Sequence, residues 1–280
     1  MIQKKPLFSF GVIADVQYCS CEPAGVRYYR KSVQKLNECL QELNQHSLSF
    51  ILDMGDLIDR DYSSFDDILE VYDQAKTRVY RSLGNHDFDV SDADKTKVSA
   101  RLGMDKAAYY DFTYLGWRFI MLNGNEVSTY AHPAGSVEAQ EAEQKLAQLK
   151  KQNAPNAQSW NGGISEQQLK WLALKLEEAS QQMQKIIVCC HFPAYPKDPH
   201  NLWNDTEVQQ LLSDTPQVVA YFNGHNHGGN YAQKDHVHYL NFKGMVDTAS
   251  ENTFAIADVY PDYLNIRGFG REDSRQLKFS

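Results

Sequence analysis

Two histidines, His225 and His227, lie two residues apart in a glycine-rich stretch that directly follows the apolar run 218–222. Glycine leaves little side-chain bulk around the two imidazoles, so both can point at one spot beyond the end of a strand. Imidazole is a common metal ligand and a common catalytic acid or base. Taken alone, the stretch could equally be a polar turn whose histidines face solvent.

Four other apolar runs also end in turns that carry possible metal ligands. In chain order, these turns offer Asp15 and Gln17, Asp56, Asn85 and His86, and His191. In open α/β sheets, sites assemble in the crevice beyond the carboxyl ends of the strands. Each residue alone is more often a helix cap or an ordinary surface or core residue. Together they predict that five turns converge on one site.

This set of donors predicts a centre of two divalent metal ions. Hard oxygen donors are mixed with imidazoles, which suits Mn²⁺, Fe²⁺ or Zn²⁺ rather than a structural zinc site, since the latter favours thiolates. If Asp15 and Asp56 are the only carboxylate ligands, they offset half of the positive charge of a pair of divalent ions. Such a centre stays cationic, and it can hold hydroxide and polarise a phosphoryl oxygen. This is the chemistry of a phosphoesterase.

The elements that would position these residues alternate between strands and helices. Strands rich in β-branched and aromatic residues lead into the five turns, at 7–13, 49–52, 79–83, 186–190 and 218–222. Helices are predicted at 26–43, 63–76, 136–150, after the capping-box pattern 165–168, and at 207–212. An antiparallel pair is expected at 109–113 and 117–122, with later strands at 237–242, 254–260 and 263–268. No repeat or linker divides the chain, so we expect a single domain over residues 1–280.

Composition limits the partners of the protein. The formal net charge of −8 would repel nucleic acid and anionic membranes on average, so neither is expected as a partner. No stretch approaches the roughly 20 apolar residues of a membrane span. A local cationic site could still attract a small phosphorylated nucleotide as substrate. We expect the protein to be a monomer.

The cysteines and the N-terminus bear on the compartment. The cysteines are odd in number, form no C-x-x-C motif, and include an adjacent pair, Cys189 and Cys190, in an apolar run, so a disulfide framework is not expected. The first apolar run is short, lacks a small-residue cleavage site and runs directly into Asp15, which favours a strand over a signal peptide. A reducing compartment, the cytoplasm, is therefore expected.

The series of motifs resembles a known family. The five-block signature of the calcineurin-like metallophosphoesterases is similar, in order and spacing, to the series Asp15-x-Gln17, Gly55-Asp-x-x-Asp59, Gly84-Asn-His-Asp87, His191 and Gly224-His-Asn-His227. The resemblance covers about residues 7–228. It implies an α/β fold of the metallo-dependent phosphatase type, a four-layer α/β/β/α sandwich in which helices flank two mixed sheets.

The same resemblance implies a role for each residue. One metal ion would be held by Asp15, Gln17, Asp56 and His227, and the other by Asp56, Asn85, His191 and His225, so that Asp56 bridges the pair. His86 would stabilise the transition state or protonate the leaving oxygen. Asp59 and Asp87 would orient the ligands or His86.

One residue departs from the wider family pattern. The first block of the family usually reads Asp-x-His, whereas this chain has Gln17. A carboxamide oxygen is a harder donor than imidazole, which favours manganese over zinc. Together with the stretches 160–163, 168–172, 191–196 and 243–248, this change resembles the manganese-dependent ADP-ribose/CDP-alcohol diphosphatases over nearly the full chain.

This narrower resemblance implies a reaction. The substrate would be a nucleoside diphosphate linked to a sugar or an alcohol, of the ADP-ribose or CDP-choline type, and hydroxide held on the metal pair would cleave the diphosphate. A cyclic-nucleotide phosphodiesterase or a phosphomonoesterase on the same fold is the alternative. A non-catalytic scaffold is disfavoured because no expected ligand position carries an apolar residue.

Residues on the substrate side are less well defined by the sequence. Asn161, with the glycine backbone that follows it, could bind phosphate at the start of a helix, although a simple helix-entry turn is the alternative. Arg60 and Arg27 could each clamp a phosphate, and a surface salt bridge is the alternative for each.

Overall fold

Two mixed sheets pack face to face in the computed structural model, which describes residues 5–105 and 107–279. Over these residues the first sheet has the order β12-β11-β10-β1-β2-β3 and the second the order β4-β5-β6-β7-β9-β8. The first sheet contains β1 (Phe8–Ile13), β2 (Ile51–Asp53), β3 (Val79–Arg81), β10 (Thr253–Val259), β11 (Tyr263–Gly270) and β12 (Arg275–Lys278). The second contains β4 (Tyr110–Tyr114), β5 (Trp117–Met121), β6 (Lys185–Cys189), β7 (Val218–Asn223), β8 (Asn230–Lys234) and β9 (Val237–Asn241).

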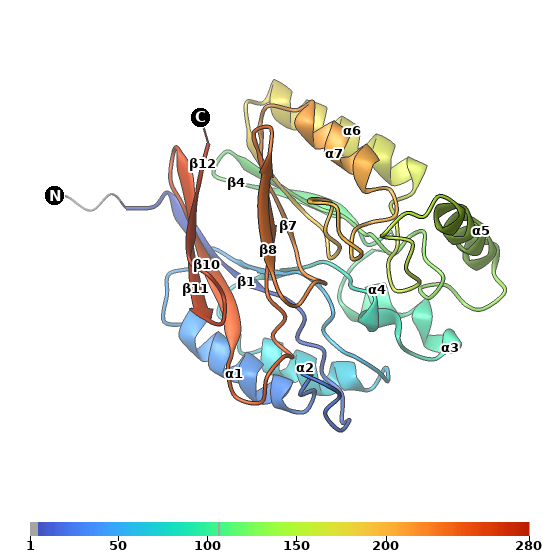
Figure 1. Cartoon of the computed structure of the whole chain (residues 1–280). Helices are drawn as coiled ribbons and strands as arrows, with labels where there is room; N and C mark the ends of the chain where they lie inside the picture. The colour runs from blue at the N-terminus through green and yellow to red at the C-terminus, as the bar shows by residue number, and fades with distance from the viewer. Residues whose placement is uncertain (1–4, 106, 280) are drawn as a thin grey trace.

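Helices cover the outer face of each sheet (Figure 1). The first sheet is covered by α1 (Lys31–Leu43) and α2 (Ser64–Tyr72), and the second by α6 (Glu166–Gln181) and α7 (Asp205–Ser213). The short helices α3 (Asp92–Lys95) and α4 (Val98–Arg101) and the longer α5 (Val137–Lys151) lie to one side (Figure 1). The predicted four-layer sandwich is therefore confirmed.

Alternation along the strands produces the layers. In β1, Phe8, Phe10 and Val12 point between the sheets, where they pack with Phe119 and Phe222. Ile13 points to the other face, into the cluster formed by α1 and α2. Period-two alternation with both faces apolar is what a sheet buried on both sides requires. A second aliphatic cluster joins α6 and α7 to the other sheet.

The strands that lead into the site are parallel and in register. Ile13 of β1 pairs with Asp53 of β2, and Asp53 pairs with Arg81 of β3. In the other sheet, Cys189 of β6 pairs with Phe222 of β7. Because the carboxyl ends of these strands are level, the turns that follow them open onto the same edge of the sandwich, as the sequence predicted.

Several element boundaries differ from the prediction. Helix α1 begins at Lys31 rather than near residue 26, because residues 24–28 form a strap that bonds to residues 246–248 instead of to a helix. Helix α2 ends at Tyr72, before the predicted 76. Strands β8 and β12 were not predicted because both are polar and short.

Only one of the two hydrogen bonds of the predicted capping box forms. Ser165 Oγ accepts a hydrogen bond from Gln168 N, but the Gln168 side chain does not return to Ser165. The backbone N–H of Ser165 donates instead to Glu126 Oε2, while Gln168 bonds both to Glu126 and to the backbone of Asn123. The helix start is thereby anchored to the loop that follows β5.

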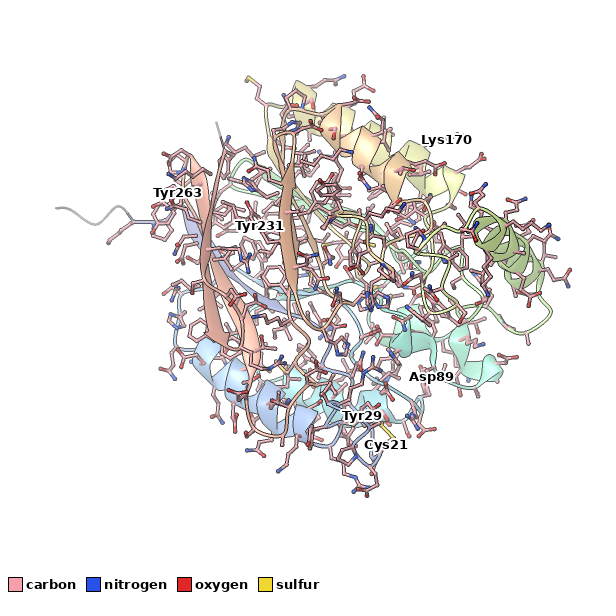
Figure 2. All side chains as sticks on the ribbon, viewed as in Figure 1. Cys21, Tyr29, Asp89, Lys170, Tyr231 and Tyr263 are labelled. Atoms are coloured by element: carbon pink, nitrogen blue, oxygen red, sulfur yellow. A yellow bond between two sulfur atoms is a disulfide. The ribbon has the colours of Figure 1, made fainter. Side chains whose placement is uncertain are left out.

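The cysteine prediction was wrong at one place. Cys19 and Cys21 form a disulfide with Cα atoms 5.2 Å apart, in the loop after β1, and Cys21 lies close to Tyr29 at one end of the molecule (Figure 2). The other cysteines, Cys39, Cys189 and Cys190, are free and buried. Among the helices of residues 5–105 and 107–279, none is both long enough and apolar enough to cross a membrane.

Candidate metal centre

The turns of the site hold an unusual backbone conformation. Asp15, Gln17, Asp56 and His225 have φ values of 52°, 45°, 59° and 71°. L-residues rarely occupy this left-handed region, which costs about 1–3 kcal/mol each and is concentrated at functional sites. Backbone hydrogen bonds lock two turns together, since Asp15 N donates to Gly55 O and Gln17 N to Asp56 O. The turns are therefore held against their local preference.

Two glycines allow the turns to approach the carboxylates. A Cβ atom at Gly84 would overlap Asp56 Oδ1, and one at Gly224 would lie 2.5 Å from Asp15 Oδ2. A side chain at either position would push apart the turns that carry the acids. These glycines are explained by close approach rather than by a positive φ.

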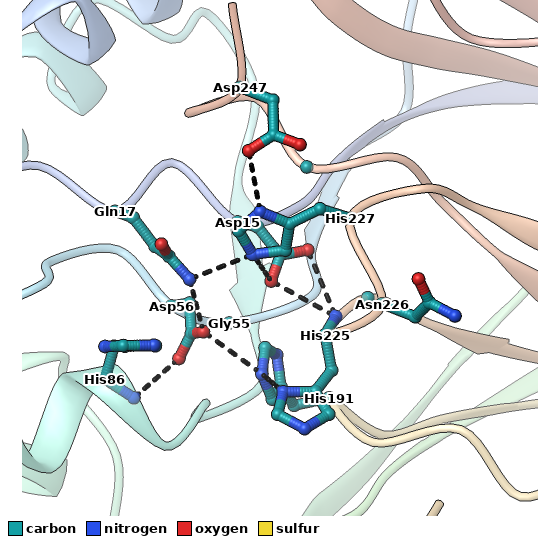
Figure 3. Close-up of polar contacts among 12 residues, drawn as sticks. Asp15, Gln17, Gly55, Asp56, His86, His191, His225, Asn226, His227 and Asp247 are labelled. Carbon is teal, nitrogen blue, oxygen red and sulfur yellow. Dashed lines mark hydrogen bonds and ion pairs between the residues drawn. The ribbon is translucent and has the colours of Figure 1, made fainter. Parts of the chain in front are cut away.

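Asp56 lies at the centre of the cluster (Figure 3). Its Oδ2 atom is 2.9 Å from Gln17 Nε2 and 3.3 Å from His191 Nε2, and its Oδ1 accepts a hydrogen bond from His86 N. Ligand atoms of Asp56, His191 and His225 all lie within 4.8 Å of one another. All three side chains are buried. One carboxylate thus reaches residues from both halves of the predicted ligand set.

The remaining predicted ligands join the same cluster. Asn85 Oδ1 is 3.3 Å from His191 Nε2, which is in turn 3.1 Å from His225 Nδ1. On the other side, His227 Nε2 is 3.1 Å from Gln17 Nε2 and 3.6 Å from Asp15 Oδ1 (Figure 3). The structure therefore brings together all seven residues that the sequence proposed as ligands.

Each of the three histidines has one ring nitrogen turned away from the cluster and bonded to an oxygen. These outward contacts join His191 Nδ1 to Met54 O at 2.8 Å, His225 Nε2 to Asn161 Oδ1 at 2.9 Å, and His227 Nδ1 to Asp247 Oδ1 at 2.9 Å. Because these oxygens can only accept, each outward nitrogen carries a proton. In the neutral ring the inward nitrogen is then a lone pair, which is the form that binds metal.

The inward atoms need a cation between them. His191 Nε2 faces Asp56 Oδ2 and Asn85 Oδ1, so lone pairs converge without a donor unless a proton or a metal ion lies there. Burial lowers the pKa of His191, but Asp56 outweighs it and raises that pKa to about 9. Burial likewise opposes ionisation of Asp56, yet His191 and His86 hold its pKa well below the usual range. A metal ion would meet the same demand and displace the proton.

Gln17 fits a metal site after one rotation. Its Oε1 atom is buried without a hydrogen-bond partner, while Nε2 faces Asp56 and His227. Rotating the carboxamide by half a turn exchanges the two atoms and points the oxygen at the cluster. The residues present therefore fit a pair of divalent ions.

His86 lies at the rim of this centre. Its Nδ1 is 3.0 Å from Asp59 Oδ1, its Nε2 is 3.4 Å from Arg27 Nη1, and 20% of its side chain is exposed. Burial lowers the pKa of His86, but Asp56 and Asp59 outweigh burial and raise that pKa. Asp59 also accepts from Arg60 Nε at 3.0 Å. His86 is thus held by a carboxylate on one side and faces Arg27 on the other, with part of its ring exposed.

Asp87 ties two of the turns together. Its carboxylate accepts hydrogen bonds from the backbone N–H groups of Gly84, Asp56, Leu57 and Ile58. It touches no ring nitrogen of the cluster. Its contacts fix the second turn against the third.

The two residues suggested for substrate binding occupy different settings. Asn161 has no exposed surface, and all of its side-chain polar atoms are engaged, with His225, Asn156 and Pro199. Arg60 is on the surface, with 52% of its side chain exposed, and is paired with Asp59. Asn161 therefore contacts a predicted ligand directly.

Sequence reasoning missed two residues that support the centre. Asp247 accepts from His227, and Lys35 Nζ donates to the backbone oxygens of Met245, Asp247 and Thr248. The stretch 243–248 contributes to the family resemblance, but that resemblance assigns no role to Asp247. Lys35 lies in an amphipathic helix, where lysine normally faces solvent, so no sequence signal marks it.

The fold and the site together define a class of protein. Residues 8–229 match the model of the calcineurin-like phosphoesterase family, and the chain belongs to that family of phosphoester hydrolases. The chain is 31% identical to a manganese-dependent ADP-ribose/CDP-alcohol diphosphatase of Arabidopsis thaliana over 98% of both chains. It is 27% identical to the protein of the same name from Homo sapiens, over 98% of this chain and 93% of the human one. A solved dimetal phosphatase from Danio rerio has the same fold, with a TM-score of 0.88, 24% identity and coverage of 99% of this chain and 100% of the other.

Proposed function

We propose that the protein hydrolyses the diphosphate bond of nucleoside diphosphates linked to a sugar or an alcohol, such as ADP-ribose and CDP-choline, with manganese as its preferred metal. The observation that carries this proposal is the match to manganese-dependent ADP-ribose/CDP-alcohol diphosphatases over 98% of this chain. Gln17, at a position where the wider family usually has histidine, supports manganese because a carboxamide is a hard donor.

The proposed ligand sets follow the two sides of Asp56. One ion would be held by Asp15, Gln17, Asp56 and His227, and the second by Asp56, Asn85, His191 and His225. The separate contacts of Asp56 Oδ2 with Gln17 and with His191 support its role as the bridge. Asn161, Asp247 and the Met54 carbonyl would fix the tautomers of the three histidines.

The chain's own residues would position the substrate and stabilise the negative charge that develops on the departing phosphate. When bound, a pair of divalent ions activates water and polarises the phosphoryl oxygens. His86 lies beside Asp56 and is oriented by Asp59 through its Nδ1, so its Nε2 faces outward toward the substrate. The departing phosphate needs little protonation, so His86 acts mainly as a positive hydrogen-bond donor near the developing charge. Asp59 holds the ring in that orientation.

A substrate panel tests the proposal. Metal-stripped protein is given Mn²⁺, Mg²⁺ or Zn²⁺ and assayed with ADP-ribose, CDP-choline, a cyclic nucleotide and p-nitrophenyl phosphate. We expect the highest kcat/KM for a diphosphate with Mn²⁺. Cleavage of the cyclic diester alone would refute the proposal in favour of a cyclic-nucleotide phosphodiesterase, and cleavage of the monoester alone would favour a phosphomonoesterase.

The organisation of the protein is part of the same proposal. We propose that residues 1–280 act as one domain, as a monomer in the cytoplasm, on a small nucleotide and without nucleic acid or membrane. Three free, buried cysteines support a reducing compartment. In that compartment the Cys19–Cys21 pair would be reduced. Thiol counting on protein trapped with alkylating agent in intact cells tests this point.

A further inference from the structure

Arg27 directs its guanidinium at the open side of His86. Arg27 Nη1 is 3.4 Å from His86 Nε2, the ring nitrogen that Asp59 does not bind. His86 links the central carboxylate to the arginine, since its backbone N–H donates to Asp56 Oδ1 and its ring contacts Arg27. A group that reaches the metal centre past His86 therefore meets Arg27 next.

The charge of Arg27 has no carboxylate partner, unlike that of its neighbours. Arg60 is paired with Asp59 at 3.0 Å, and Arg30 with Glu22 at 2.7 Å. Across residues 5–105 and 107–279, Arg27 forms no salt bridge, and its polar side-chain contact is the one with His86. In a chain with a net charge of −8, an unpaired guanidinium beside a catalytic centre is free to bind an anion.

The backbone around Arg27 is fixed to the centre. Arg27 and Ala24 exchange two backbone hydrogen bonds, and this strap pairs with the segment that carries Asp247. Thr248 N donates to Val26 O, and Tyr28 N donates to Val246 O. Because Asp247 also holds His227, the same segment positions Arg27 and one predicted metal ligand. Arg27 is therefore part of the built site and not a residue of a free surface loop.

We propose that Arg27 binds the phosphate that departs from a diphosphate substrate, and so selects diphosphates over simple phosphate diesters; this inference rests on the proposed function. In the reaction, water oxygen forms a bond to one phosphorus, and the bond from that phosphorus to the bridging oxygen breaks. The electron pair stays on the bridging oxygen, which leaves as a terminal oxygen of the second phosphate. The two protons of the water are released to solvent or carried by the two phosphate products.

The position of Arg27 matches the place where this charge develops. The two phosphorus atoms share one bridging oxygen, so a phosphate attacked beside Asp56 has its leaving phosphate next to His86 and Arg27. A guanidinium can donate two parallel hydrogen bonds to a phosphate. Because the leaving phosphate gains charge in the transition state, the contact strengthens there and contributes to kcat more than to KM.

Arg60 is less suited to this role. Its Nε is already committed to Asp59, and removing it would disturb the carboxylate that orients His86. A loss of activity on changing Arg60 would therefore affect every substrate. Arg27 reaches His86 only through the 3.4 Å contact with Nε2 and does not bond to Asp59, so its substitution leaves the carboxylate that orients His86 in place.

The test compares two substrates in three variants. ADP-ribose has a phosphate as its leaving group, whereas bis(p-nitrophenyl) phosphate has a phenolate and a single phosphorus. With Mn²⁺, Arg27→Gln should lower kcat/KM for ADP-ribose by about ten- to a hundredfold, mostly in kcat, and change that for bis(p-nitrophenyl) phosphate by less than about threefold. Arg27→Lys should recover part of the loss. Arg30→Gln, which removes the same charge from the same loop, should leave both values near wild type.

A binding measurement separates recognition from turnover. Methylenediphosphonate cannot be hydrolysed, and its inhibition constant against bis(p-nitrophenyl) phosphate should rise about tenfold in Arg27→Gln, while that of orthophosphate should stay unchanged. An equal loss on both substrates would overturn the assignment of Arg27 and leave the diphosphatase function intact. A wild-type protein that cleaves bis(p-nitrophenyl) phosphate but not ADP-ribose would instead refute the proposed function, and the assignment with it.

Discussion

Asn161 Oδ1 lies 2.9 Å from Nε2 of His225, and both side chains are buried. The amide nitrogen of Asn161 donates to the backbone oxygens of Asn156 and Pro199, which fixes the oxygen as the atom that faces the imidazole. His225 must therefore carry its proton on Nε2 and turn Nδ1 toward the metal centre. A residue that sequence suggested as a phosphate contact instead determines which nitrogen of a proposed metal ligand is available.

Replacing this asparagine should weaken metal binding without changing any proposed ligand. We expect Asn161→Leu to lower Mn²⁺ affinity about 10- to 100-fold, the usual effect of losing a partner that orients a metal-binding histidine. Isothermal titration calorimetry on metal-stripped protein measures this. Asn201→Leu is the matched control, because Asn201 is equally buried but its side chain bonds to Ala194, Pro196 and Asp205 and to none of the three proposed histidine ligands. If Asn161→Leu bound Mn²⁺ as tightly as wild type, Asn161 would have no role in orienting His225.

Lys35 should prove essential to the segment that carries Asp247. Its Nζ donates to Met245 O, Asp247 O and Thr248 O at 2.5, 2.8 and 2.9 Å, and its side chain is buried. Lys35→Met would remove this donor from Met245 O and Thr248 O. Asp247 O would keep only its longer contact with Arg271 Nη2, at 3.5 Å. We therefore expect the free energy of unfolding to fall by about 2–5 kcal/mol. Urea denaturation measures it, with Lys31→Met on the exposed face of the same helix as control. A loss below about 1 kcal/mol would mean that water replaces the ammonium.

The positions of the seven proposed ligands could be inferred from sequence because each follows directly on an apolar strand. Parallel strands in register bring such turns to a single edge, so a one-dimensional pattern was sufficient to predict the cluster. The layered fold followed from the same alternation of apolar strands and amphipathic helices.

Contacts between distant segments could not be inferred in this way. Lys35 is separated from Met245 by 210 positions, and its spacing in α1 gives no sign that an ammonium is buried. The residues before Lys31 continue the apolar spacing of the helix, yet they form the strap that positions Arg27. Their backbone groups bond to Val246 and Thr248 instead of to a helical turn. Strands β8 and β12 could not be predicted from the sequence because their side chains are mostly polar.

His86 should affect turnover and not metal binding. It contacts Asp56 only through its backbone N–H, so the ligand set remains complete without the imidazole. We expect His86→Ala to lower kcat by about 10²- to 10⁴-fold with Mn²⁺ affinity nearly unchanged. Asp59→Asn should give a smaller loss, because the imidazole stays in place and only its orientation and its raised pKa are affected. Steady-state kinetics at saturating Mn²⁺ measure kcat for both variants. A fully active His86→Ala would show that His86 has no catalytic role.

Asp53 should make stability depend on pH. Burial raises its pKa from 3.8 to about 6, against the opposing effect of Arg81. Between about pH 4 and 6 the folded protein therefore holds a proton that the unfolded chain releases, so stability falls as pH rises through this window. Asparagine has no charge to bury and can still accept from Gly55 N. In Asp53→Asn, the free energy of unfolding should rise relative to wild type by about 1–3 kcal/mol between pH 4 and pH 7.

The measurement for Asp53 is urea denaturation of metal-stripped protein at a series of pH values. Asp73→Asn, at an exposed position that ends α2, is the control for removing one carboxylate. A difference between Asp53→Asn and wild type that stays constant with pH would show that Asp53 is ionised in the folded protein over the whole range.

Gln17 should set the metal preference of the site. Its carboxamide lies 2.9 Å from Asp56 Oδ2 and 3.1 Å from His227 Nε2, so it reaches two of the three other proposed ligands of the first ion. Gln17→His replaces a hard oxygen donor by a nitrogen donor, which should raise the affinity for Zn²⁺ relative to Mn²⁺ by about tenfold or more. Competitive titration with the two ions measures the ratio directly, and the kcat/KM obtained with each ion should shift in the same direction. Gln17→Asn keeps the carboxamide but shortens its reach, so it should weaken binding of both ions without reversing their order. An unchanged Zn²⁺ to Mn²⁺ ratio in Gln17→His would mean that Gln17 supports Asp56 through a hydrogen bond and does not bind the metal.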